Sequence, residues 1–259
     1  MNIVVCVKQV PDTAVERTLR AGDGTLDRAS VDGLINELDE YAIEEGLKIA
    51  EAHGGEVTIL SMGPGKAAES IRKALSMGAD KAVHVTDDAL AGSDALGTSL
   101  ALAAALQRVG FDLVVFGAES TDARTGVVPA MVAERLGVPQ LTLASKVDID
   151  GGSVTVRRVS DDGYQVVTGS LPAVVSVVEK INEPRYPTFK GIMAAKKKPV
   201  QTLSLADLGV DASAVGLAGA ASWVEDFTVR PPRQAGVVVK DEGDGGSKAA
   251  GFLAERKFI

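Results

Sequence analysis

Short runs of β-branched residues alternate with helix-like segments over the first half of the chain, and this alternation narrows the possible folds more than any other feature. The candidate strands are residues 2–7, 56–62, 81–86 and 112–117. Between the first two, Leu38, Ile43 and Leu47 recur near the 3.6-residue period of an α-helix. Further helices are expected up to Gly78, over 94–109 and up to Gly137. Strands that alternate with helices form a parallel sheet covered by helices, so an α/β fold is predicted.

The second half has a different pattern. Residues 146–179 contain runs of period 2 separated by Gly151-Gly152 and Asp162-Gly163, which predict β-hairpins appended to the parallel sheet. Beyond Glu183 the periodicity is lost, and only 247–259 is expected to be helical. A tail without a core of its own must pack on this domain or on a partner subunit, and we favour a partner.

Composition limits the function. The 259-residue chain has a net charge of −8 and a pI near 4.9, which argues against binding to nucleic acid or to an anionic membrane. A single cysteine excludes an internal disulfide, and two histidines offer no zinc site. No targeting signal precedes the first strand, and no apolar run is long enough to span a bilayer. We therefore expect a cytoplasmic protein without direct membrane insertion.

The loop after the fourth strand, "GAESTDARTGVV", is the most informative local motif. Small and hydroxylated residues leave the strand and lead into a helix expected to open at Thr125-Gly126, where free N–H groups favour a phosphate. An ordinary strand-to-helix connection explains the loop equally well, because it contains neither G-x-G-x-x-G nor a P-loop lysine. Taken alone, Asn36 suits a helix N-cap, and Cys6 and His84 suit packing inside strands.

No nucleophile with an orienting partner and no paired acid and base stand out in the sequence. This predicts a nucleotide-binding domain that is not an enzyme and performs no bond-making chemistry of its own.

Several separate stretches resemble the small (β) subunit of electron transfer flavoprotein. The motifs lie along the whole chain in the order of that family, and they are "VKQVPD", "MGADKAVHV", "VRRVSDDGYQVVTGSLPAVVS", "NEPRYPT", "IMAAKKK", "DLGVD" and "PPRQAGVVV". The resemblance implies a Rossmann-like, doubly wound domain over 1–183, a partner-recognition loop and basic segment over 184–198, and a C-terminal arm over 199–259 that wraps an α subunit.

The resemblance also implies a function. Such a heterodimer holds FAD mainly on its α subunit, accepts electrons from acyl-CoA dehydrogenases of fatty acid β-oxidation and related dehydrogenases, and passes them to a quinone oxidoreductase. The β subunit binds a structural AMP. Matched residue by residue, the AMP site would contain Cys6, Asn36, Glu37, Leu38, Asp39, Met62, Gly117, Ala118, Glu119, Ser120, Thr121, Asp122, Ala123, Arg124 and Thr125.

This chain departs from the family pattern at a few positions. The 117–125 loop is short, and Val127 stands where a glutamine is common, so Arg124 is expected to supply phosphate contacts made elsewhere in relatives. Thr13 and Leu38 replace a tyrosine and a phenylalanine that approach the flavin in animal members. Little direct tuning of the flavin by this subunit is therefore expected.

The apolar side chains of the 184–198 segment are its predicted docking residues. They are Tyr186, Phe189, Ile192 and Met193, and Phe189 takes the position of the leucine that anchors relatives on a dehydrogenase. The alternative is that Phe189 and Ile192 pack back onto their own domain.

Two other functions fit parts of the sequence. One is a bifurcating family member, in which a second FAD replaces AMP; a flavin count per heterodimer distinguishes it. The other is a stand-alone nucleotide-binding regulator of the universal-stress type, which would purify as a homodimer with bound ATP. The recognition segment and the arm have no explanation in this second alternative.

Overall fold

The computed structural model describes residues 1–232 and 235–259. Arg233 and Gln234, part of the "PPRQAGVVV" motif, lie outside the described residues. The chain divides into two units, which are described separately. Residues 1–225 form the α/β domain, and the described part of residues 226–259 contains one helix, α8 (Gly245–Glu255).

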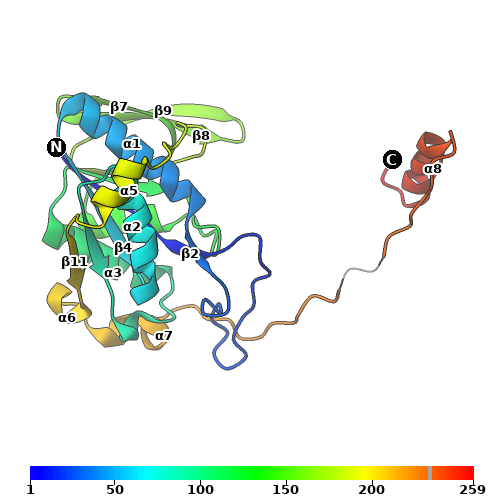
Figure 1. The fold of residues 1–259 in the computed structure, drawn as a ribbon, viewed down its shortest axis with the longest axis horizontal. Coiled ribbons are helices and arrows are strands. Elements are labelled where there is room, and N and C mark those ends of the chain that lie inside the picture. The colour runs from blue at the N-terminus through cyan, green and yellow to red at the C-terminus, as the bar shows by residue number, and fades with distance from the viewer. Residues whose placement is uncertain (233–234) are drawn as a thin grey trace. The chain divides into compact units, whose positions relative to one another are not determined.

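A nine-stranded sheet organises the α/β domain (Figure 1). In spatial order its strands are β11 (Val200–Leu203), β5 (Lys81–Val85), β4 (Glu56–Met62), β1 (Asn2–Cys6), β6 (Leu113–Gly117), β10 (Ala173–Val177), β7 (Gln140–Asp150), β8 (Ser153–Ser160) and β9 (Gly163–Ser170). Pairing is parallel from β11 through β7 and antiparallel from β7 through β9. A separate two-stranded ribbon joins β2 (Gln9–Pro11) to β3 (Gly33–Ile35). The predicted Rossmann-like, mostly parallel fold is confirmed.

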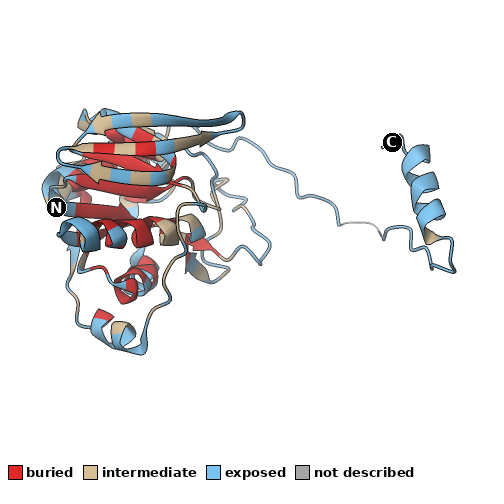
Figure 2. Ribbon diagram, turned by 90° about the horizontal axis from the view of Figure 1, so that it is seen from above, coloured by how far each residue is buried: buried red, intermediate tan, exposed pale blue. Residues whose placement is uncertain are grey.

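Helices cover both faces of the sheet. On one face, Ile43 of α1 (Glu37–His53) and Leu75 of α2 (Ala68–Met77) share a core with Ile3 and Val5 of β1. On the other face, α3 (Ala95–Val109) and α4 (Val128–Leu136) bury Leu106 and Val132 against Val4 and Val114. Figure 2 shows that burial is concentrated in the central strands, whereas most of β9 is exposed.

The order of the strands creates a switch point. From β1 the chain moves outward through β4 and β5, with α1 and α2 on one face, and then α3 returns it on the other face to β6. Connections therefore leave the carboxyl ends of the neighbouring strands β1 and β6 in opposite directions. The crevice outside such a pair of strand ends is where open α/β sheets bind ligands.

The interpretation of residues 146–179 as appended hairpins was correct only in part. The β7–β8 and β8–β9 hairpins form as predicted, but β10 lies between β6 and β7 and is parallel to both. All five β10 residues are buried, which is typical of a strand covered on both faces.

The chain beyond Glu183 has more structure than its lack of periodicity predicts. Residues 189–195 of the expected recognition loop form helix α5 (Phe189–Ala195). The arm proposed to begin at 199 first supplies β11, α6 (Leu205–Leu208) and α7 (Gly216–Gly219) to the α/β domain. The helix expected over 247–259 is α8, whose residues are exposed after Gly245. Within the described part of the chain, no helix is both long and apolar enough to cross a membrane.

The position of Leu203 at the end of β11 can be tested directly. Its side chain is buried in the core on the sheet face covered by α3 and α4, whereas Gln201 on the same strand is exposed. We predict that Leu203→Ala lowers the free energy of unfolding by about 2–5 kcal/mol. Gln201→Ala should change it by less than about 0.5 kcal/mol. Urea denaturation of both variants measures the two free energies of unfolding. Equal values would show that β11 does not pack as the edge strand beside β5.

Candidate functional site

The residues matched to the AMP site gather at the switch point. Cys6, Met62 and Gly117 end the neighbouring strands β1, β4 and β6. Residues 118–127 follow β6 and lead to α4, and residues 36–39 form the start of α1. Asn36 donates a hydrogen bond to the carbonyl of Glu119, so the α1 start and the loop after β6 are in direct contact.

Asn36 joins these two segments through its side chain. It is fully buried, and its amide nitrogen donates to Asp39 Oδ1 at 3.0 Å and to the Glu119 carbonyl at 2.9 Å. Its amide oxygen accepts a hydrogen bond from the Thr121 N–H at 3.0 Å. Asn36 occupies the N-cap position of α1 without making a side-chain capping bond. The N-cap interpretation was therefore wrong about the side chain, which holds the loop instead.

Gly117 lets β6 pass close to the start of α1. A Cβ atom at this position would lie 2.5 Å from Asp39 Oδ1 and 2.7 Å from the carbonyl carbon of Leu38. Because the second contact is with backbone, a side chain could be accommodated only if strand and helix moved apart. The sequence therefore needs glycine where the strand ends.

Asp39 is a buried carboxyl beneath the loop. Its Oδ2 accepts a hydrogen bond from the Lys8 N–H at 2.8 Å. Burial raises the pKa of Asp39 to about 7, although hydrogen bonds from Asn36 and Lys8 favour the charged form. Burial, with Asp39 nearby, also raises the pKa of the Cys6 thiol, so Cys6 is a packing residue and not a reactive thiolate.

Asp122 anchors the middle of the loop to two cations. Its side chain is 0% exposed and pairs with Lys8 at 2.8 Å and with Arg28 at 2.5 Å. Burial opposes its ionisation, but Lys8 and Arg28 together hold the pKa of Asp122 well below its usual range. Burial lowers the pKa of Lys8, and Asp122 counteracts this. Two cations facing one carboxylate leave a net positive charge beside the loop.

Sequence inspection did not identify Lys8, Arg17 and Arg28 as part of this site. Lys8 lies two residues after the end of β1, so its place near a strand end was a usable signal. Arg17 donates to the Thr121 carbonyl at 2.6 Å. Both arginines lie in the irregular residues 12–32, where no period or motif relates them to a loop about a hundred residues away in the sequence.

The last part of the loop differs in detail from the prediction. The expected helix start at Thr125-Gly126 lies two residues too early, because α4 begins at Val128. Arg124 has a positive φ of 50° and lies 3.7 Å from a Glu119 carboxylate oxygen, with its side chain mostly exposed. Val127 provides no side-chain cap for α4, and Pro129 has no backbone N–H to donate.

Three other residues singled out from the sequence lie outside this loop. Glu37 and Thr13 are exposed, and Leu38 is half-buried.

A second group of predicted residues lies on the segment that contains α5. Tyr186 is 93% exposed and Phe189 is 80% exposed, and about half of Ile192 and of Met193 is accessible. The arrangement in which Phe189 packs onto its own domain is therefore not the one observed. Thr188 caps α5 by accepting from the Gly191 N–H at 3.0 Å.

Helix α1 holds the beginning of this segment. Arg185 donates to Glu44 at 2.7 Å and to Glu51 at 2.6 Å. Asn182 donates to Glu45 at 3.0 Å and to the Tyr41 carbonyl at 3.1 Å. The hydrogen bonds that Arg185 donates to Glu51 and Glu44 raise the pKa of its guanidinium further above the ordinary value.

Comparison with known proteins identifies relatives along the full chain. A family model described as "Electron transfer flavoprotein domain" matches residues 23–208. "Electron transfer flavoprotein subunit beta" of Mycobacterium tuberculosis is 53% identical, with 100% of this chain and 99% of that protein covered. The protein of the same name from Clostridium acetobutylicum is 39% identical, with complete coverage of both chains. "Protein FixA" of Azorhizobium caulinodans is 42% identical over 87% of this chain and 83% of its own length.

The raised pKa of Asp39 predicts a pH-dependent stability. In the unfolded chain this carboxyl ionises near pH 4, whereas in the folded chain it ionises near pH 7. Its favourable contribution is therefore complete below about pH 4 and is lost as the pH rises to about 7, by up to roughly 4 kcal/mol. In Asp39→Asn this loss should be absent, so the variant should gain stability relative to wild type between pH 4 and 7. Urea unfolding across this range measures the difference, and parallel curves for the two proteins would contradict the assignment.

Proposed function

Because this chain belongs to the electron transfer flavoprotein family as a β subunit, we propose that it forms a heterodimer with an α subunit that holds most of the FAD. The pair would carry electrons from acyl-CoA and related dehydrogenases to a quinone oxidoreductase. The β subunit would contribute a structural nucleotide site and a docking segment, without substrate chemistry of its own. The observation that carries this proposal is the loop of residues 117–125, which is attached to α1 through Asn36 at the switch point.

The proposed nucleotide is AMP. Its phosphate would lie against the loop, where Lys8 and Arg28 leave a net positive charge after pairing with Asp122. Arg124 adds a mostly exposed cation at the same loop, 3.7 Å from the Glu119 carboxylate. Asn36 already holds the Glu119 carbonyl and the Thr121 N–H in place, so little further ordering of the loop is needed when a nucleotide binds. Cys6, Met62 and the 36–39 segment would form the remaining walls.

The proposed docking residues are those of the α5 segment. Apolar side chains that are exposed on a segment fixed to the domain are suited to a transient interface, because they lose little conformational freedom on binding. Phe189 is the proposed anchor. The ion pairs of Arg185 with Glu44 and Glu51 would fix the position of the segment on α1.

A carboxylate in the phosphate loop tests the AMP site. In the purified heterodimer, Thr125→Glu should weaken AMP binding about two- to fivefold through repulsion near the α4 N-terminus. Thr125→Gln has the same size without the charge and should bind AMP like wild type. Calorimetric titration with AMP, and mass spectrometry of released nucleotides, provide the measurement. Equal affinities for the two variants would contradict the site.

The nucleotide content of the purified protein also distinguishes the proposed function from its two alternatives, the bifurcating form and the stand-alone regulator. One AMP and one FAD per heterodimer are expected. Two FAD and no AMP would identify the bifurcating form, and a homodimer of this chain with ATP would identify the regulator.

Truncation of the anchor tests docking. Phe189→Ala should weaken the encounter with an acyl-CoA dehydrogenase by about 2 kcal/mol, which is roughly thirtyfold. The melting temperature should stay the same, because the ring is mostly exposed in this chain. Phe189→Leu keeps an apolar anchor and should retain most of the coupling. Melting curves and dehydrogenase-dependent flavin reduction are measured on the same samples. A destabilised Phe189→Ala protein that remains fully coupled would exclude the docking role.

A further inference from the structure

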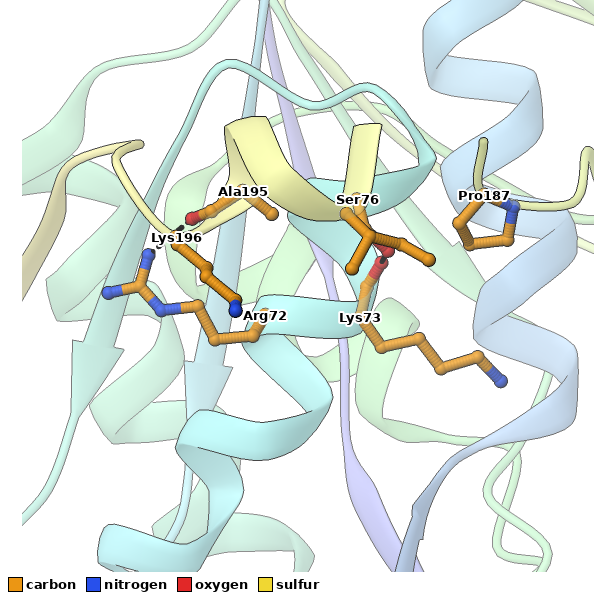
Figure 3. Close-up of a pocket in the computed structure, with 7 residues that line it drawn as sticks. Arg72, Lys73, Ser76, Pro187, Ala195 and Lys196 are labelled. Atoms are coloured by element: carbon orange, nitrogen blue, oxygen red, sulfur yellow. Dashed lines mark hydrogen bonds between the residues drawn. The ribbon is translucent and has the colours of Figure 1, made fainter. Parts of the chain in front are cut away.

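A groove lies between α2 and α5, beside the proposed docking residues. Its main cavity has a volume of about 520 Å³ and is lined by Arg72, Lys73, Ser76, Pro187, Ile192, Ala195 and Lys196 (Figure 3). A second cavity of about 220 Å³ adjoins it, and Lys73 and Pro187 line both. Neither cavity contains residues of the 117–125 loop, and Glu37 is the residue of the proposed nucleotide site that lines the second cavity.

The walls of the groove are held rigidly. A Cβ atom at Gly191 would lie 2.5 Å from the Ser76 carbonyl oxygen, so α5 rests directly on the last turn of α2. Arg72 of α2 donates to the Ala195 carbonyl at 2.7 Å, the contact drawn in Figure 3. Lys198 donates to three carbonyls at the end of α2, with distances between 2.6 and 3.1 Å. The groove is therefore preformed, and little ordering is required when a partner binds.

Positive charge is concentrated around the main cavity although the whole chain carries −8. Lys190, Lys196 and Lys197 are exposed and pair with no carboxylate of the described residues. Arg72 contacts only carbonyl oxygens there and keeps its charge uncompensated. Figure 3 shows the side chain of Lys196 extending from α5 toward α2.

The adjoining cavity is mixed in charge. Its lining contains two acidic residues, Glu37 and Glu40, and two basic residues, Lys73 and Arg185, beside Tyr41 and Tyr186. Lys73 pairs with Glu40 where the two cavities meet. Arg185 pairs with Glu44 and Glu51. The groove thus changes from a basic cavity to one in which most charges are paired, which would give a bound segment a preferred direction.

We propose that this groove is a socket for a protein partner. The occupant is a surface segment of the dehydrogenase that inserts one apolar side chain against Pro187, Ile192 and Ala195 and places carboxylates against Lys196 and its neighbours. The proposal rests on the proposed docking function and adds to it, since Phe189 would anchor in the partner while the partner anchors in this groove. A free phosphate would leave the apolar lining unused, and an anionic membrane would be repelled by the net charge of the chain.

Reversal of one charge tests the electrostatic half of the proposal in the intact heterodimer. Lys196→Glu should raise the KM for the heterodimer in dehydrogenase-dependent reduction about tenfold at low salt. This difference should shrink at about 0.5 M salt, where exposed charges are screened. Lys180→Glu makes the same change in net charge at an exposed lysine that lines neither cavity, and its KM should stay near wild type. Equal KM values for the two variants would overturn the proposal.

Filling the main cavity tests whether an apolar side chain of the partner inserts into it. Ile192→Trp adds a large ring at a half-exposed wall, so it should raise KM at low and high salt alike without lowering the melting temperature. Normal KM values for both Ile192→Trp and Lys196→Glu, alongside impaired Phe189→Ala, would reject the socket but keep the docking function. Unimpaired coupling in all three variants would reject both.

Sedimentation with vesicles tests the membrane as a different partner. We expect no binding to phosphatidylcholine vesicles that contain about one-third phosphatidylserine. Binding that is lost in Lys196→Glu would overturn the proposal and assign the basic cluster to a lipid surface.

Discussion

The buried contact between the start of α1 and the end of β6 is the constraint on which the rest of the site depends. Asn36, Asp39 and Gly117 fit together without room for a Cβ atom on the glycine, and Asn36 then fixes the loop through Glu119 and Thr121. The same 17-residue helix carries Glu44 and Glu51, which hold Arg185 at the beginning of the docking segment. One helix therefore supports both the proposed nucleotide site and the proposed docking surface, so each surface has a defined position relative to the sheet.

The cations at the 117–125 loop and the exposed lysines at α5 differ in whether a carboxylate of the described residues pairs with them. At the loop, Lys8 and Arg28 are paired with a fully buried carboxylate, so their charges order the backbone and are only partly available to a phosphate. Around α5, Lys190, Lys196 and Lys197 are exposed, and their charges can attract a partner over a Debye length of about 10 Å at 0.1 M salt. The first arrangement suits a permanently bound structural ligand, and the second suits rapid, reversible encounters.

The sequence predicted what depends on local periodicity and missed what depends on distant contacts. The β-branched runs correctly located β1, β4, β5 and β6, and the helical stripe correctly located α1. β10 was assigned to the hairpins because it falls in the same stretch of period-2 runs, whereas its complete burial between β6 and β7 is a property of the whole sheet. In the site, the residues matched through family resemblance meet at one edge of the sheet. Arg17 and Arg28 were missed because only the folded path of residues 12–32 brings them to the loop.

We propose that Asn36 holds the loop in its binding shape before any nucleotide arrives. Amide hydrogen exchange at Thr121, measured on the heterodimer after its nucleotide has been removed, provides the test, because the Thr121 N–H donates to Asn36 Oδ1. We expect this amide to be protected without nucleotide, and we expect Asn36→Ala to remove the protection and to weaken AMP binding together. A Thr121 amide that exchanges like an open loop in the nucleotide-free wild type, and becomes protected only when AMP is added, would show that the nucleotide and not Asn36 shapes the loop.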